Sequence, residues 1–185
     1  RGGDIDGEAV DDLSGYSVSL SADGNIVAIG APANDGNGSN SGHVRLYAWN
    51  GSAWVQRGND IDGETAGDLS GTSVSLSADG NIVAIGAPGN DGNGSDSGHV
   101  RLYAWNGSAW VKRGGDIDGE AVDDLSGYSV SLSADGNIVA IGAPANDGNG
   151  SNSGHVRLYA WNGSAWVQRG GDIDGEAVDD LSGYS

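Results

Sequence analysis

The chain has 185 residues, no cysteine, and a formal net charge of −18 from 26 acidic and 8 basic side chains. The lack of cysteine excludes a disulfide framework and thiol chemistry, and the acidic balance argues against nucleic acid and anionic membrane surfaces as partners. No hydrophobic stretch is long enough to cross a bilayer. The 35 glycines show no three-residue period and occur with only 3 prolines, which is typical of a turn-rich all-β protein.

The sequence repeats every 56 residues. Residues 1–56, 57–112 and 113–168 form three full units, and residues 169–185 begin a fourth. Units one and three are identical, and unit two differs from them at eight positions. Because no linker or change in composition separates the units, domain boundaries are expected only at the edges of the repeats.

The first two expected strands of each unit differ in pattern. Residues 17–21 alternate, with Val18 and Leu20 on one face, and a turn at 22–24 follows in which Gly24 supplies a positive φ. Residues 26–29 are four consecutive apolar residues within an expected strand over 25–31, which indicates a strand covered on both faces. We therefore expect this strand in mid-sheet, with other sheets packed above and below it.

Two further strands complete the unit. Residues 34–42 form a polar loop with the composition of turns, and residues 43–49 alternate again. Asn50-Gly51 predicts a two-residue type I′ hairpin, followed by a fourth strand over 53–61 that Gly58 weakens. Four antiparallel strands per unit predict a blade of a β-propeller, in preference to a solenoid or a sandwich.

The stretch 13–32, together with 42–47, resembles an FG-GAP repeat, the blade type of the integrin α-chain propeller. Its Gly-Ala-Pro part at 30–32 matches, whereas the Phe-Gly position holds Ser14-Gly15. The resemblance covers every unit. It implies a propeller that is extracellular or at the cell surface and serves adhesion or recognition.

The family resemblance also implies calcium in the loop before the central strand. In this chain Ser19 and Ser21 stand where carboxylates are expected early in that loop, and only Asp23 remains. The metal site of the family is therefore not carried over to this chain.

A different acidic cluster, at the start of each unit, is the candidate calcium site. Alternate carboxylates on a glycine-containing turn can direct several oxygens at one Ca²⁺. We favour a simpler role, in which a solvated connection between blades uses its charges to protect a sheet edge from mispairing. The candidate ligands are Asp4, Asp6, Glu8, Asp60, Asp62, Glu64, Asp116, Asp118 and Glu120.

Two other repeated features suggest glycans. Asn-Gly-Ser triplets fit the N-glycosylation pattern at Asn37, Asn50, Asn93, Asn106, Asn149 and Asn162, although turn formation alone explains them. Tryptophans that flank each Asn-Gly could stack on sugar rings, but cross-strand packing that fixes strand register is the favoured role. These residues are Trp49, Trp54, Trp105, Trp110, Trp161 and Trp166.

No enzyme is expected. His43, His99 and His155 are equivalent copies, and a residue repeated in every unit is a structural feature, whereas catalysis usually needs one asymmetric constellation.

The number of units bears on function. Propellers close with about four to eight blades, so three blades leave apolar sheet faces uncovered, and the sequence predicts association with copies of itself or with adjoining repeats of a longer chain. The expected function is a structural or adhesive scaffold, as a filament or a multi-chain propeller. The alternative is a propeller that binds glycans or calcium-dependent protein partners. Because the chain begins at Arg1 and has no methionine, we expect a processed product or an excerpt.

Overall fold

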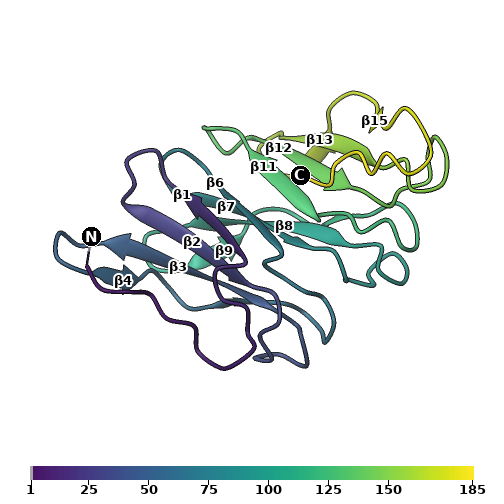
Figure 1. The fold of residues 1–185 in the computed structure, drawn as a ribbon. Coiled ribbons are helices and arrows are strands. Elements are labelled where there is room, and N and C mark those ends of the chain that lie inside the picture. Colours follow the sequence, from purple (N-terminus) through teal and green to yellow (C-terminus); the bar gives the residue numbers. More distant parts are fainter. Residues whose placement is uncertain (1) are drawn as a thin grey trace.

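The computed structural model describes residues 2–185, and it is all-β with three antiparallel sheets of five strands each (Figure 1). We call these sheets blades 1, 2 and 3. Blade 1 contains β1 (Ser17–Leu20), β2 (Ile26–Ala31), β3 (His43–Trp49), β4 (Trp54–Gln56) and β5 (Ile61–Asp62). Blade 2 contains β6 (Ser73–Leu76), β7 (Ile82–Ala87), β8 (His99–Trp105), β9 (Trp110–Lys112) and β10 (Ile117–Asp118). Blade 3 contains β11 (Ser129–Leu132), β12 (Ile138–Ala143), β13 (His155–Trp161), β14 (Trp166–Gln168) and β15 (Ile173–Asp174).

The fourth strand of each blade is broken in two. We expected one strand over 53–61, but β4 and β5 pair separately with β3, and the intervening residues leave the sheet. Gly58 lies in the gap with a φ of +85°, and a Cβ there would approach Trp105 and Trp110 to about 3 Å. The positive φ and the contact with these tryptophans of the next blade turn the chain out of the strand at this point.

The hairpin prediction at Asn50-Gly51 is wrong in its turn type. Trp49 pairs with Trp54, so four residues form the loop, and the positive φ of a type I′ turn is found at Gly51 (101°) but not at Asn50. The Asn50 Oδ1 atom accepts hydrogen bonds from the backbone N–H of Ser52 and of Ala53 at 2.9 Å each. The Asn50 side chain therefore closes this loop together with a backbone bond, in which the Asn50 N–H donates to the Ala53 carbonyl oxygen at 3.1 Å.

The other predictions for the blade are confirmed. Gly24 has a φ of 67° and its N–H donates to the Ser21 carbonyl oxygen at 2.9 Å, closing the first turn. β2 lies between β1 and β3, as a mid-sheet strand should. In blade 2, where both faces are covered, Val83, Ala84 and Ile85 are all buried.

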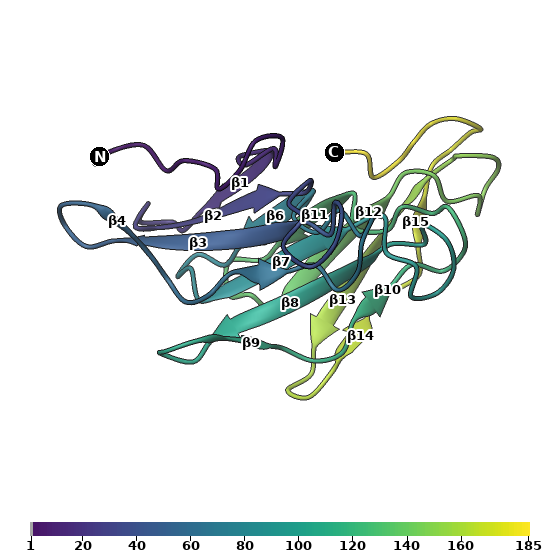
Figure 2. The same cartoon turned by 90° about the horizontal axis from the view of Figure 1, so that it is seen from below.

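The blades stack in one direction, as the layered view in Figure 2 shows. We call the side of each sheet that carries Ala28, Val44, Leu46 and Ile61 in blade 1 face A, and the opposite side, with Val18 and Leu20, face B. Face A of blade 1 packs on face B of blade 2, contributed by Val74, Leu76, Val83 and Ile85. Face A of blade 2 packs on face B of blade 3 in the same manner.

The innermost strands β1, β6 and β11 are neighbours across the stack. The packing there depends on glycine, since a Cβ on Gly86 would lie 1.9 Å from the Gly127 carbonyl oxygen. The Ser73 hydroxyl donates to that same oxygen at 2.8 Å, and the Ser19 hydroxyl accepts from the Leu76 N–H at 3.0 Å. Backbone polar groups at the interfaces are therefore paired across blades.

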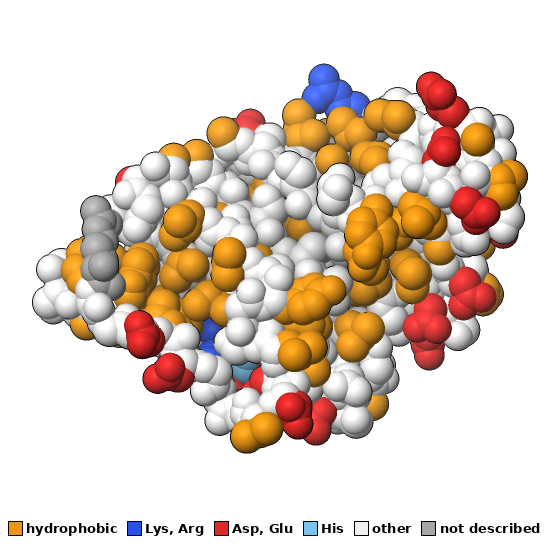
Figure 3. All heavy atoms as spheres, viewed as in Figure 1, with side chains coloured by type: hydrophobic (Ala, Val, Ile, Leu, Met, Phe, Trp, Pro, Cys, Tyr) orange, Lys and Arg blue, Asp and Glu red, His pale blue; other side chains and the backbone are white. Residues whose placement is uncertain are grey.

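The three blades do not close a ring. Face B of blade 1 and face A of blade 3 have no sheet packed on them, so Val18, Leu20 and Ile173 are exposed by 57–64%. Apolar side chains gather over the strands of blade 1 on the face shown in Figure 3. None of the described residues builds a helix of the length and apolarity that a membrane span requires.

Candidate metal centres at the blade edges

A buried histidine opens the third strand of every blade. His43 is the first residue of β3 and pairs with Asp62 of β5. The period of two along the strand places Arg45 on the same side of the sheet as His43. Both side chains are buried, because residues 2–16 pass over this end of face B, where Asp12 binds Asn34 at 2.8 Å.

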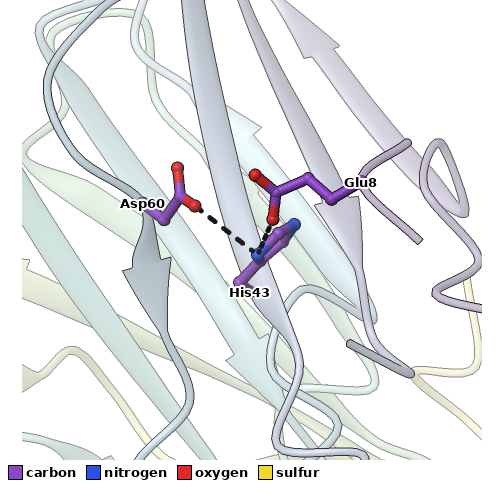
Figure 4. Close-up of side chains that lie close together, drawn as sticks. All are labelled: Glu8, His43 and Asp60. Atoms are coloured by element: carbon purple, nitrogen blue, oxygen red, sulfur yellow. Dashed lines mark ion pairs between the residues drawn. The ribbon is translucent and has the colours of Figure 1, made fainter. Parts of the chain in front are cut away.

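Glu8 reaches His43 from this covering segment (Figure 4). Its Oε1 atom lies 3.1 Å from Nη1 of Arg45, and its Oε2 atom lies 3.8 Å from Nδ1 of His43. Arg45 Nη2 also donates to the backbone carbonyl of Asp6 at 2.9 Å. The guanidinium thus fixes both the segment and the orientation of the carboxylate.

Asp60 approaches the same imidazole from the other side (Figure 4). It lies between β4 and β5, and its Oδ2 atom is 4.0 Å from Nδ1 of His43. Its other oxygen accepts a hydrogen bond from Gln56 at 2.5 Å. One imidazole nitrogen and two carboxylate oxygens therefore converge within 4.8 Å of one another, and this group could hold a metal ion.

The group recurs in each blade. We call Glu8–His43–Asp60 centre 1, Glu64–His99–Asp116 centre 2 and Glu120–His155–Asp172 centre 3. In centre 2, Lys112 replaces the glutamine and its Nζ atom lies 2.6 Å from Asp116. A surface pocket opens over centre 2, and Asn90, Asp91 and Asp118 also line it.

The histidines of centres 2 and 3 are held in the neutral form. Burial, and then the neighbouring Arg101 guanidinium, lower the pKa of His99. Burial and Arg157 likewise lower the pKa of His155. A neutral imidazole keeps a lone pair with which it can bind a metal ion.

The ligands predicted from the sequence are only part of each centre. We expected carboxylates of one turn to act together, whereas the structure joins Glu8 to Asp60, which is the counterpart of Asp4 one unit later. The histidines were expected to have no ligand role. Recurrence of His at the start of an alternating strand was the available signal, but no pattern in sequence brings residues 8, 43 and 60 together.

The loop that binds calcium in the resembled family is closed here by hydrogen bonds. Asp23 accepts from the Ser21 hydroxyl at 2.7 Å and from the backbone N–H of Asn25 at 2.9 Å. The Asn25 side-chain amide donates to Oδ2 of Asp23 at 2.8 Å. These bonds lower the pKa of Asp23 from 3.8 to about 2, and they occupy its carboxylate with donors of the protein itself.

The six asparagine triplets fall into two classes. The Asn37 side-chain amide donates to the carbonyls of Gly63 and Glu64 at 2.8 Å each, and Asn93 and Asn149 make the equivalent bonds. A glycan on these nitrogens would break the contact between loop and connecting segment. Asn50, Asn106 and Asn162 lie on exposed loops and accept through Oδ1, so modification is geometrically easier there.

The tryptophans pair across the hairpin and also serve the interface. Trp105 and Trp110 lie 5.4 Å apart between ring centroids, and Arg57, which directly follows β4 of blade 1, lies over both rings, at 4.8 and 5.4 Å. Trp110 Nε1 donates to the Arg57 carbonyl at 2.7 Å. Arg113 repeats this arrangement on Trp161 and Trp166, so an arginine lies over one face of each of these four indoles.

Comparison with known proteins agrees with this architecture. A chain of hydrazine synthase from Kuenenia stuttgartiensis has a similar fold, with a TM-score of 0.56 and 13% sequence identity over 95% of this chain and 40% of that one. This chain thus spans less than half of the hydrazine synthase chain, and the likeness concerns the fold alone. A search of curated proteins found no significant match. The model of the FG-GAP repeat matches residues 5–47, 61–103 and 117–159, and the chain therefore belongs to the FG-GAP repeat family.

Proposed function

We propose that this chain is a structural or adhesive, non-enzymatic module, at the cell surface or outside the cell, whose end blades stack on further blades of the same kind. These blades come from other copies or from adjoining repeats, and the product is a filament or a multi-chain propeller. The observation that carries the proposal is that the two uncovered sheet faces are the two complementary halves of the interface that occurs twice inside the chain.

The two faces differ in kind. Each internal contact joins a face A to a face B, and the uncovered surfaces are face B of blade 1 and face A of blade 3. Ile173 on the latter is 57% exposed, whereas its counterparts Ile61 and Ile117 are 6% and 4% exposed. An interface between unlike faces propagates from head to tail, and it gives a ring if the rotation closes and a filament if it does not.

A polar contact at the internal interfaces supports the same alignment of an added blade on face A of blade 3. The hydroxyl of Ser75 accepts from the Leu132 N–H at 2.9 Å across one internal interface. Ser131 holds the equivalent position on face A of blade 3 and is exposed. A blade added there would present the N–H of its own Leu20 to this hydroxyl.

Association between copies requires an exchange of segments. Residues 1–17 and 169–185 are identical in sequence, and at each internal interface one such segment serves both neighbours: Gly63 bonds back to Gly42, while Glu64 bonds forward to Arg101. When face A of blade 3 in one copy meets face B of blade 1 in another, residues 169–185 of the first copy and residues 1–17 of the second compete for the same place between the two blades. We therefore expect slow association of the native chain and faster association after deletion of residues 1–16.

Sedimentation and light scattering over a concentration series test this function. The expected masses are multiples of 18.5 kDa, and Leu20→Asp or Ile173→Asp should reduce association. Val55→Asp is the matched control, because Val55 is 49% exposed and its counterparts Val111 and Val167 are 49% and 50% exposed, so stacking does not bury this position. Electron microscopy distinguishes filaments from rings. A strict monomer at every concentration, for the native chain and for the deletion, would rule the proposal out.

A further inference from the structure

We propose that each Glu–His–Asp centre binds a divalent transition-metal ion of the Zn²⁺ class, in preference to Ca²⁺. The inference does not require blade stacking, since each centre is complete within one chain. It rests on the position of the imidazole, on the orientation of the two carboxylates and on a difference between the three centres.

The imidazole is buried without a hydrogen-bonded partner. His99 and His155 are each 1% exposed, and their Nε2 atoms have no partner among the described residues. Nδ1 of His155 lies 3.9 Å from Glu120, and Nδ1 of His43 lies 3.8 and 4.0 Å from its two carboxylates. These distances exceed a hydrogen bond. Two metal–ligand bonds of about 2.0–2.1 Å at a tetrahedral angle place their donor atoms about 3.4 Å apart, so binding an ion requires the carboxylates to move towards the imidazole by about half an ångström.

Both carboxylates are oriented by a second group. Arg45 holds one oxygen of Glu8, and Gln56 holds one oxygen of Asp60. In each case the other oxygen is the one nearer to Nδ1 of His43. Outer partners that orient the ligands in this way are a regular part of metal sites.

The donor set selects the class of ion. Calcium takes six to eight oxygen ligands and has little use for an imidazole, whereas nitrogen with carboxylate oxygen suits zinc and its neighbours. Three protein ligands leave one tetrahedral position open for water. The pocket over centre 2 provides access from solvent.

The chain contains an internal comparison of these centres. Gln56 and Gln168 bind the aspartates of centres 1 and 3 at 2.5 and 2.6 Å. Lys112 takes that place in centre 2, and its positive charge opposes a cation at Asp116. Because changes in outer partners alter metal affinity by about 10–100-fold, centre 2 should bind that much more weakly than centres 1 and 3.

Titration of the chelator-treated full chain with Zn²⁺, by calorimetry and by elemental analysis after dialysis, tests the inference. We expect two tight sites and one that is about 10–100-fold weaker. Lys112→Gln should make the third site tight, and Glu120→Gln should remove one site. Glu176→Gln is the matched control, because Glu176 has the same position in its unit but no histidine follows it. Bound Co²⁺ should report the imidazole through its visible absorption.

Three results would overturn the inference. They are Ca²⁺ displacing Zn²⁺ at equal concentration, an unchanged number of Zn²⁺ sites after His155→Gln, and Zn²⁺ binding no higher than the dialysis background. Lys112→Gln converts the weak site into a tight one without altering the buried residues, so a folding defect in the histidine variant does not remove the test. Association is measured separately with chelator present, which distinguishes failure of this inference from failure of the stacking proposal.

Discussion

Leu20 and Leu76 occupy the same place in the repeat and the same register within their sheets, yet they lie in opposite environments. Leu20 pairs with Val27 and is 60% exposed, whereas Leu76 pairs with Val83 and is 7% exposed. The sheets themselves are alike in strands and pairing. Burial at this position is therefore set by the neighbouring blade, and the interfaces between repeats add to the stability of the individual repeats.

The largest expected effect is that of Leu76→Ala compared with Leu20→Ala. Removing a buried leucine costs about 2–5 kcal/mol, whereas an exposed position changes stability by about 0.5 kcal/mol or less. Urea unfolding of both variants as monomers measures the difference. Equal losses at the two positions would contradict the view that the neighbouring blade decides the energy.

A second pair of variants compares a paired arginine with an exposed one. Arg57 donates to the Gly80 carbonyl and to Asn81, each at 2.6 Å, and lies over two indole rings. Its replacement by alanine should cost about 2 kcal/mol. Arg169 holds the same position in its unit but is exposed, so Arg169→Ala should leave the melting temperature of the monomer nearly unchanged.

The smallest effect concerns a turn that should behave alike in blades 1 and 3. Hydrogen bonds from serine and asparagine lower the pKa of Asp23 and of Asp135 to about 2. A carboxyl whose pKa is lower in the folded state stabilises the fold above pH 4 or so, and that contribution is lost as pH falls towards 2. NMR titration should give similar midpoints for both residues, and Ser21→Ala should raise that of Asp23 towards 3.8. A midpoint that differs strongly between the blades would show that the turn depends on its neighbours.

Local patterns predicted the blades well. Alternation at Val18 and Leu20 and the apolar run at 26–29 identified two strands, and the structure pairs these strands with each other and the second also with β3. The count of three units predicted the uncovered outer faces. These features depend on residues close in sequence, and so a single repeat contains the information.

Contacts between units were beyond such patterns. The break in the fourth strand depends on Gly58 meeting Trp105 and Trp110 of the next blade. The four-residue hairpin depends on the side chain of Asn50. The metal centres combine a covering segment, a strand and a connection drawn from two consecutive units. Sequence spacing does not report which segment covers which sheet.

The segment that connects two consecutive blades, such as residues 57–72, makes contacts with both of them, and this determines how such chains can lengthen. Each insertion of 56 residues, wherever the cut falls, supplies one sheet, one arginine for the indoles ahead and one aspartate for the histidine behind. Gene duplication can then extend the protein without redesigning any junction. Copy number becomes a variable that evolution or an engineer can set freely, and function would scale with it.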